Sequence, residues 1–323
     1  MKILHVIPYH PSPSAFIFAK RQIEDLGELG HSNEIFYFKT SFSVFGFFHQ
    51  LKSLKCQVKA FAPDLIHAHY GTINAFFASR ISSVPLVVSF HGSDINYTRD
   101  IHWLREKLGK FLSFIAAKRA GKIICVSEKL QNNLPIGKEK STVLASGINT
   151  LLFREMEMNT CKESLGLDLK KNYFFFNSNN PIVKRLDLAN EVVELLRDLN
   201  AELLSLNGDV EPSEIPVYLN SCVASLLCSD SEGSPMVIKE AMACGLPIVS
   251  VDVGDVRERI QHVTNCFIVK QEAKAISEKM RELIALNNPK TNGLDILREQ
   301  KLDYLSVAKQ LENIYFQALQ IHH

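Results

Sequence analysis

Short apolar runs, many of them rich in β-branched residues, alternate with longer amphipathic stretches along the whole chain. The runs cover residues 2–7, 32–38, 64–69, 86–90, 122–127 and 141–146, and then 173–178, 201–206, 223–228, 247–251 and 266–269. Short runs of this kind, bounded by turn residues, are typical of buried strands. Their alternation with helical stretches predicts parallel βαβ units. The pattern therefore predicts an α/β protein with Rossmann-like sheets.

A charged stretch without a strand pattern, residues 154–172, separates the two series of strands. A chain of 323 residues is long enough for two cores. We therefore predict a first domain over residues 1–153 and a second over residues 154–304. Apolar residues recur at nearly helical spacing between Leu302 and Leu319, which predicts a terminal helix over residues 305–323.

Charge is distributed unevenly along the chain. The first 150 residues carry 18 Lys and Arg against 10 Asp and Glu, whereas the rest carries 18 against 25. The first half is thus expected to meet an anionic partner. Seven scattered cysteines without a Cys-x-x-Cys pair favour a reduced, cytoplasmic protein. The apolar run at the N-terminus is cut at Pro8, and no run approaches about 18 residues, so we expect a soluble or peripheral protein.

Two carboxylates stand out in the stretch SDSEGSPMVIKEAMACGLPIVS, residues 229–250. Ser234 is a good N-cap, Pro235 suits a first helical position, and Gly245 is a helix stop, which together predict a helix from Pro235 to Cys244. The N–H groups at its start would form an anion site, with phosphate as the obvious guest. Glu232 and Glu240 would repel that phosphate unless they bind something attached to it, and sugar hydroxyls are natural partners for such acids.

This stretch resembles the Glu-x7-Glu signature of glycosyltransferase family 4, retaining enzymes of the GT-B architecture. Other features of the family occur in order: PDLIHAHYG, LVVSFHGSD, KIICVSEKL, GINTLLF, VGDVRERI and NCFIVK. The resemblance implies two Rossmann-like domains, with the acceptor mostly on the first and the nucleotide-sugar on the second. It also implies that the C-terminal helix crosses back to the first domain.

The resemblance assigns roles on the donor side. It implies that Glu240 binds the ribose of the donor nucleotide and that Glu232 binds the hydroxyls of the donor sugar. Lys184 corresponds to the lysine that neutralises the leaving diphosphate. The backbone beside the sugar and phosphates would come from Gly233, Ser234, Pro235, Met236 and Val237. The alternative is a surface loop and an ordinary capped helix whose acids, like Lys184, are merely solvated.

The chain departs from the family where a Gly-Arg pair is expected, because it has NSNN there. Ser178 takes the place of the glycine and Asn179 that of the arginine, so a bidentate phosphate clamp is missing. Arg185, next to Lys184, is the other cation that could reach the phosphates.

Several residues of the first half are expected near the acceptor and the reacting carbon. His91 follows a buried strand, at the edge of the sheet where α/β proteins bind ligands. The resemblance implies that it faces the donor sugar, and the alternative is a buried structural histidine. Asp94 suits a helix N-cap as well as a site residue. On the acceptor side we also place His69, and Ser14 and Ala15, which stand where the family has small glycines.

His67 and His69 lie at i and i+2 of one strand and hence on one face, as in some metal sites. We nevertheless expect no metal and no cofactor. The chain contains no Asp-x-Asp, no carboxylate accompanies the histidines at ligand spacing, and the family motif carries such a pair without a metal.

Two basic stretches, residues 45–59 and 99–122, interleave Lys and Arg with aromatic and aliphatic residues at helical spacing. Helices that lie on anionic membranes have this composition, and so do ordinary helices with one solvated face. We therefore expect a cytoplasmic protein that is either soluble or peripheral on the inner face of a membrane.

The resemblance, together with these observations, implies a retaining, metal-independent glycosyltransferase of the hexosyltransferase type. It would move a sugar from a nucleoside-diphosphate-sugar to a glycan or a lipid-linked saccharide, in cell-surface polysaccharide biosynthesis. The alternatives are a catalytically degenerate GT-B subunit that only binds sugars and a GT-B nucleotide-sugar epimerase. A dehydrogenase is disfavoured because no Gly-x-Gly-x-x-Gly follows the first strand, and no nucleic-acid partner is expected.

Overall fold

The computed structural model describes residues 1–12, 15–39, 44–81, 83–95 and 103–322, and the side chains of residues 44 and 322 are not included. The chain divides into two compact units. Unit 1 comprises residues 1–147 together with 304–323, and unit 2 comprises residues 148–303. The division after Gly147 lies a few residues before the expected boundary at Phe153. Each unit is an α/β structure with one parallel sheet, as the sequence predicts.

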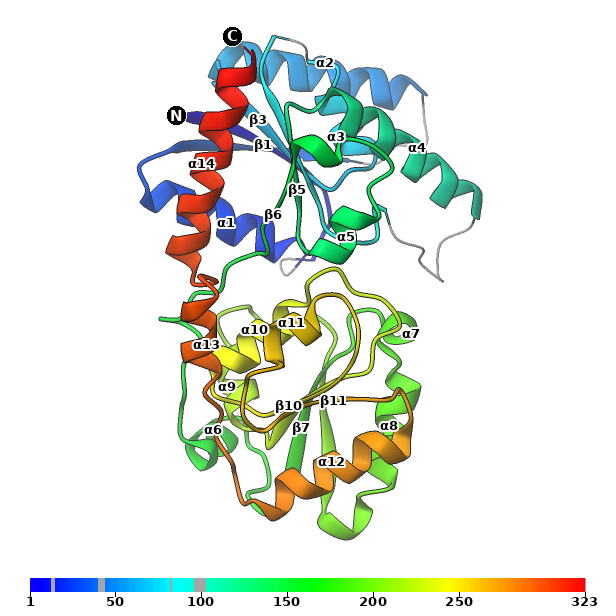
Figure 1. Cartoon of the computed structure of the whole chain (residues 1–323), viewed down its shortest axis with the longest axis vertical. Coiled ribbons are helices and arrows are strands. Elements are labelled where there is room, and N and C mark those ends of the chain that lie inside the picture. Colours follow the sequence, from blue (N-terminus) through cyan, green and yellow to red (C-terminus); the bar gives the residue numbers. More distant parts are fainter. Residues whose placement is uncertain (13–14, 40–43, 82, 96–102, 323) are drawn as a thin grey trace. The chain divides into compact units, whose positions relative to one another are not determined.

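The sheet of unit 1 has the strand order β2-β1-β3-β4-β5-β6, and every pairing in it is parallel (Figure 1). Each strand falls on an apolar run of the sequence. The strands are β1 (Lys2–Pro8), β2 (Ser32–Phe38), β3 (Leu65–His69), β4 (Leu86–Phe90), β5 (Lys122–Cys125) and β6 (Ser141–Val143).

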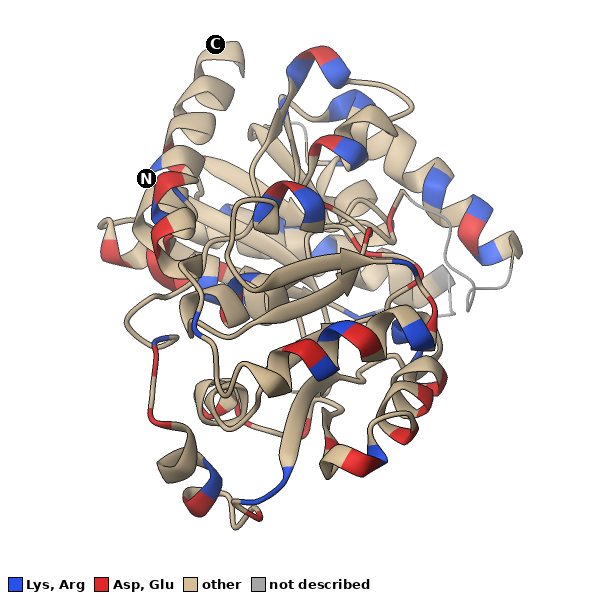
Figure 2. Ribbon diagram, turned by 60° about the horizontal axis from the view of Figure 1, so that its bottom comes forward, with Lys and Arg blue, Asp and Glu red and all other residues tan. Residues whose placement is uncertain are grey.

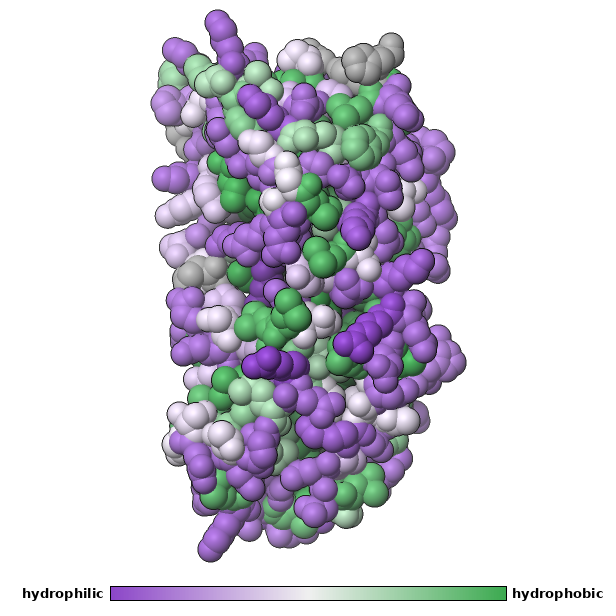
Figure 3. Space-filling view, turned by 90° about the vertical axis from the view of Figure 1, so that its left-hand side faces the viewer, coloured by the Kyte–Doolittle hydropathy of each residue, from purple (hydrophilic) through white to green (hydrophobic). Residues whose placement is uncertain are grey.

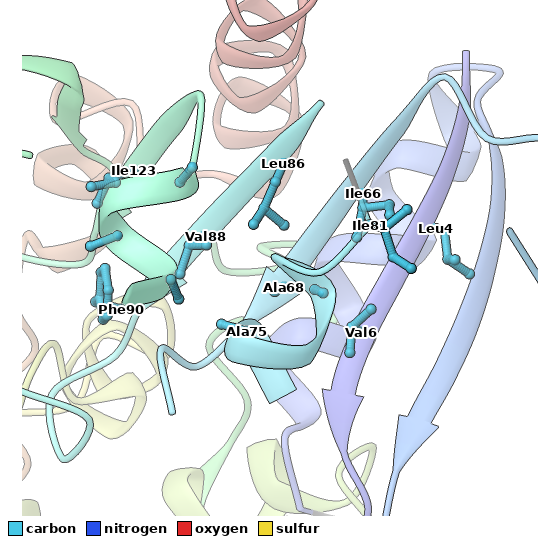
Figure 4. Packing of buried hydrophobic residues seen from close by; sticks show 14 of the residues in the cluster. Leu4, Val6, Ile66, Ala68, Ala75, Ile81, Leu86, Val88, Phe90 and Ile123 are labelled. Atoms are coloured by element: carbon cyan, nitrogen blue, oxygen red, sulfur yellow. The ribbon is translucent and has the colours of Figure 1, made fainter. Parts of the chain in front are cut away.

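Helices cover both faces of this sheet. They are α1 (Ile17–Glu28), α2 (Val44–Phe61), α3 (Ile73–Ala78), α4 (Trp103–Arg119), α5 (Glu128–Asn132) and α14 (Tyr304–His322). On one face, strand residues such as Val6, Ala68 and Phe90 pack with residues of α2, α3 and α4 in the core that Figure 4 shows. Alternate strand residues point to the opposite face, where α1 and α14 pack against each other.

The sheet of unit 2 has the order β11-β10-β9-β7-β8 and is also parallel. Its strands are β7 (Asn172–Asn177), β8 (Ala201–Leu206), β9 (Ala224–Leu227), β10 (Ile248–Val251) and β11 (Cys266–Val269). Its helices are α6 (Met158–Ser164), α7 (Pro181–Lys184), α8 (Leu186–Glu194), α9 (Ile215–Asn220), α10 (Met236–Ala243), α11 (Val256–Ile260), α12 (Ala273–Ala285) and α13 (Gly293–Glu299). Strand residues pack with α8 and α12 in the core.

The last helix, α14, follows unit 2 in sequence but belongs to unit 1, as the resemblance implies. Its start lies close to Gly147, where an added Cβ would stand 2.9 Å from the Cα of Tyr304, so a glycine is needed there. Figure 3 views the side on which α14 lies in Figure 1, and hydrophilic residues alternate there with small hydrophobic patches. Among the helices of the described residues, none is long and apolar enough to cross a membrane.

Candidate active site

The loop between β9 and α10 in unit 2 carries the predicted donor residues. Helix α10 begins at Met236, and Pro235, in an extended conformation, takes the cap position. The prediction that Ser234 caps this helix is wrong. Its hydroxyl instead donates to Oδ2 of Asp255 at 2.8 Å, and Pro235 rather than Ser234 takes the cap position of the helix. The start of α10 therefore keeps its N–H groups without a side-chain cap.

Lys184 and Glu232, which are distant in sequence, meet in unit 2. Lys184 ends the short helix α7 after β7, and its ammonium group forms an ion pair with Oε1 of Glu232. The same carboxylate oxygen accepts a hydrogen bond from Ser229 at 2.8 Å. The side chains of Lys184 and Glu232 are 16% and 14% exposed, so the pair is shielded from water yet open at one side. The fold thus brings the predicted phosphate-binding cation onto the predicted sugar-binding carboxylate.

Two backbone contacts hold this loop in place. The N–H of Asp230 donates to the carbonyl of Val183 at 2.8 Å, which ties the loop to α7. Gly254 has a φ of 60°, and a Cβ at that position would lie 2.9 Å from the carbonyl oxygen of Gly233. Only glycine fits both the left-handed backbone and this close approach. The loop after β10 therefore supports the donor loop directly.

A buried charged network that the sequence analysis missed lies behind the donor loop. Lys239 is fully buried on α10, and its ammonium group lies 3.3 Å from the Ser234 hydroxyl. Asp255 accepts from Ser234 and from Nε of Arg259, the latter at 2.8 Å. Burial lowers the pKa of Lys239 to about 8, although the charge of Asp255 acts to raise it. A lysine among apolar helix positions is the one signal in the sequence that points to this network.

Ser178 and Asn179, which replace the family's Gly-Arg pair, differ in their exposure to solvent. Ser178 is buried, and its N–H donates to the carbonyl of Leu206 at 2.7 Å, whereas Asn179 is exposed. The guanidinium of Arg185 donates to Asp187 and Asp230, and the hydrogen bonds to Asp187 are the main cause of its raised pKa. Two carboxylates thus offset the charge of Arg185, whereas Lys184 pairs with Glu232, which itself belongs to the predicted donor site.

In unit 1, Asp94 joins the loops that follow β3 and β4. Its buried carboxylate accepts backbone N–H bonds from Gly71 at 3.0 Å, His91 at 3.1 Å and Gly92 at 2.9 Å. Burial raises the pKa of Asp94, and these three bonds oppose that rise. The geometry makes Asp94 a positioning residue that fixes the backbone around His91.

His91 lies in an aromatic cluster at the carboxyl ends of the strands. Its ring centroid is 4.3 Å from that of Phe18 and 5.1 Å from that of Tyr70. In the loop that precedes Phe18, Ala15 is half-buried and Phe16 has a φ of 57°. Ser14 lies outside the described residues. The loop thus adopts at Phe16 the left-handed backbone that a glycine would take without strain, at a cost of about 1 kcal/mol. The sequence left open whether this loop adopts such a backbone without a glycine.

His69, predicted on the acceptor side, belongs with His5 and His67 to a fully buried cluster in unit 1. His5 Nδ1 lies 3.2 Å from His69 Nε2, and the two nitrogens of His67 lie 2.7 Å from the hydroxyls of Tyr315 and Ser89. Burial lowers the pKa of all three histidines, that of His5 to about 4. The cluster is therefore a neutral hydrogen-bonded network.

The same three histidines each offer a nitrogen, and these atoms lie within 4.8 Å of one another, which is close enough for a metal ion. Two features of the donor set speak for hydrogen bonding instead. Both nitrogens of His67 already have hydroxyl partners, and the groups that contact the three rings, including Asn33, are uncharged. A metal ion would have to displace one of the hydroxyl partners of His67.

Two family models match the chain. The model described as glycosyltransferase family 4 covers residues 10–150, and the model described as glycosyl transferases group 1 covers residues 199–294. Together they take in the loops of His91 and Asp94 in unit 1 and the Lys239, Glu232 and Glu240 region in unit 2.

Both matches are to glycosyltransferase families, and each lies mainly within one unit of the chain. A curated relative from Bacillus subtilis strain 168, named for teichuronic acid biosynthesis as the glycosyltransferase TuaC, is 28% identical over 67% of this chain. This chain spans 60% of that relative's length.

Solved structures show the same fold at lower identity. Sucrose-phosphate synthase from Thermosynechococcus elongatus is 14% identical, with a TM-score of 0.78 over 98% of this chain and 99% of its own. Anabaena HepE, solved in complex with UDP-glucose, is 16% identical, with a TM-score of 0.74 over 97% of this chain and 98% of its own. The likeness establishes the GT-B fold for this chain.

Proposed function

We propose that this chain is a retaining, metal-independent hexosyltransferase that uses a nucleoside-diphosphate-sugar donor. The acceptor would be a glycan or a lipid-linked saccharide in cell-surface polysaccharide biosynthesis. The observation that carries the proposal is the Lys184–Glu232 ion pair beside the uncapped start of α10. UDP-glucose in HepE and the teichuronic acid context of TuaC support the donor and acceptor classes.

The proposed chemistry breaks the bond between the anomeric carbon and the diphosphate oxygen. The acceptor hydroxyl oxygen bonds to that carbon from the same face, and its proton passes to the leaving diphosphate. Negative charge grows on the leaving diphosphate. Lys184 and the N–H groups at the start of α10 would stabilise that charge. A bound phosphate would compete with Glu232 for Lys184, which would release the Glu232 carboxylate to accept the hydroxyls of the donor sugar.

The experiment that tests the donor assignment is the Glu240→Ala variant. Loss of a carboxylate that accepts ribose hydroxyls should weaken UDP binding about tenfold or more, as measured by titration calorimetry. Glu278→Ala, which removes an exposed acid from α12 of the same unit, is the matched control and should bind UDP as the parent does. Equal UDP affinity in Glu240→Ala and the parent would contradict the assignment.

Metal independence has its own test. Sugar transfer should persist in an excess of EDTA, since Lys184 and the helix N-terminus supply the positive charge that a divalent ion supplies in other transferases. Loss of transfer in EDTA that manganese restores would overturn this part of the proposal.

A lipid-linked acceptor would bring unit 1 to a membrane, which we propose to be the inner, cytoplasmic face. The outward side of α4 exposes Trp103, Leu104, Leu108 and Phe111, each more than half exposed. Basic residues interrupt this apolar surface, and in Figure 2 α4, at the right beside the grey trace, carries mostly blue bands. Aromatic and basic residues mixed in this way suit a helix at the interface of an anionic bilayer.

A further inference from the structure

Unit 1 has a hollow that lies away from the predicted active-site loops. It measures about 510 Å³ and lies between α2, the loop before β3 and the segment between α3 and β4. Pro63 and Val84 line it, and they precede β3 and β4, so the hollow is at the amino ends of the strands. His91 and Asp94 follow the carboxyl end of β4, which is the opposite edge of the sheet.

Among the described residues, three cations and no carboxylate line this hollow. They are Lys55 and Lys59, one turn apart on α2, and Arg80, which follows α3. In the described part of the chain, none of their side chains forms an ion pair or a hydrogen bond. Helix α2 contains no Asp or Glu at all. The positive charge of the hollow is therefore not neutralised by the protein.

Two carboxylates on neighbouring parts of the chain have other partners. Asp64, next to the lining residue Pro63, accepts from the N–H of Lys2 at 2.8 Å. Glu34 on β2 accepts from Gln57 of α2, also at 2.8 Å. Neither carboxylate lines the hollow.

Arg80 is oriented by an aromatic ring. Its guanidinium carbon lies 4.4 Å from the ring centroid of Phe76. Stacking uses the face of the guanidinium and leaves the N–H groups at its edge available to donate. A planar fork of this kind matches two oxygens of one phosphate group.

The floor of the hollow is apolar. Ile81, Val84 and Pro63 are buried there, and Val58 is half-buried. An adjoining hollow of about 710 Å³ shares Arg80, Ile81 and Val84 and adds Arg119 and Ile321. A small inorganic anion would use only the cations at the rim, whereas a lipid would use both the cations and the floor.

We propose that the hollow formed by Lys55, Lys59 and Arg80 binds the phosphate of an anionic phospholipid. The three side chains would contact the phosphate oxygens, and the first carbons of the acyl chains would lie over the floor. The site is separate from the donor loop and does not take part in sugar transfer. It would hold unit 1 to a membrane through a specific head group rather than through net charge alone.

Titration calorimetry of the full chain with short-chain lipids below their micelle concentration tests this. Dihexanoyl phosphatidylglycerol should bind, and dihexanoyl phosphatidylcholine, whose choline offsets the phosphate charge, should bind at least tenfold more weakly. Arg80→Gln and Lys59→Gln should each weaken phosphatidylglycerol binding by about tenfold. Lys52→Gln is the matched control, because Lys52 is an exposed lysine of the same helix that does not line the hollow.

Other outcomes decide against parts of the proposal. Inorganic phosphate that binds as tightly as the lipid, and competes with it, would make a free anion the occupant and overturn the lipid assignment. Phosphatidylglycerol affinity that is equal in Arg80→Gln, Lys59→Gln and the parent would overturn the site. UDP affinity serves as the folding control for each variant, and lipid binding that survives in Glu240→Ala keeps this result separate from that of the donor site.

Discussion

At the scale of single residues, Lys184 should carry an unusual share of catalysis. The arginine of the family is replaced by the exposed Asn179, and Arg185 is engaged by Asp187 and Asp230. With one cation facing a diphosphate whose charge grows in the transition state, Lys184→Ala should lower turnover on the order of a hundredfold to a thousandfold. UDP affinity should fall less than turnover does, which steady-state kinetics and calorimetry together measure.

Asn179→Arg makes this prediction sharper. If that position faces the phosphates, the new guanidinium should restore part of the lost turnover in the Lys184→Ala background. Lys170→Ala, which removes an exposed lysine of the same unit, is the control and should leave turnover unchanged. Near-parental turnover in Lys184→Ala would instead mean that Arg185 exchanges its carboxylate partners for the phosphates.

The sequence predicts those parts of the site whose residues are close together in the chain, and it does not predict contacts between distant residues. Glu232 and Glu240 are spaced within one loop and helix, so their pattern can be recognised in the sequence. The role of Ser234 cannot be read in this way, because Asp255 reaches it only after β10 and α11 have folded next to the donor loop. The same holds for the ion pair of Lys184, since the sequence holds no sign of which carboxylate it meets.

At the scale of elements, the histidine cluster joins β1, β3 and α14, and it makes the stability of unit 1 depend on pH. Burial lowers the pKa of His5 from 6.5 to about 4, so the unfolded chain binds a proton that the folded chain excludes. The free energy of unfolding should therefore fall as the pH falls from about 6.5 towards 4. His5 alone should account for on the order of 3 kcal/mol of this loss. His67 and His69, with pKa values also lowered, add to this loss.

Urea unfolding between pH 7 and pH 5 measures the effect. Asp25, whose pKa is raised to about 7 by burial and by Glu28 and Glu24, has the opposite dependence, so the series is made in an Asp25→Asn background. His5→Gln should flatten the decline, whereas His262→Gln, on the surface of unit 2, should not. An equally steep decline in His5→Gln would show that groups other than His5 cause the pH dependence.

The observed helices and strands agree with the sequence predictions where an element is long enough for its hydrophobic periodicity to be recognised. Every predicted strand is present, because each is a compact apolar run that the sheet buries. Helix α7 has only four residues, which is too short for a helical period, so nothing in the sequence predicts it. Helix α8 ends at Glu194, and a separate 3₁₀ turn follows over Arg197–Leu199.

At the scale of the whole molecule, two units of opposite charge share one chain, and α14 returns to the basic unit. The packing of α14 explains this return: Tyr315 is fully buried, and its hydroxyl lies 2.7 Å from His67 Nδ1. The sequence predicts the helix from its apolar spacing, but only the resemblance to a known family predicts where it goes. The contact with His67 depends on a pairing 248 residues apart, which no local pattern encodes.

The uneven charge leads to a prediction about membranes. Exchange of Lys110, Lys118 and Arg119 for Gln should weaken binding to anionic vesicles at low salt by about 1 kcal/mol for each charge. Trp103 is the single tryptophan of the chain and is 57% exposed on α4, so its emission should shift to the blue when α4 enters the bilayer interface. Added salt should weaken binding, because it screens charges between exposed groups.

Exchange of Lys170, Lys270 and Lys274 for Gln in unit 2 gives the control, since it removes the same net charge from the other unit. If the basic residues of α4 act by their position, this control should bind vesicles almost as the parent does. If both triple variants lose binding equally, net charge alone draws the protein to the membrane. Vesicle binding without any shift of Trp103 emission would place the contact away from the start of α4 and would leave its apolar face as an ordinary solvated surface.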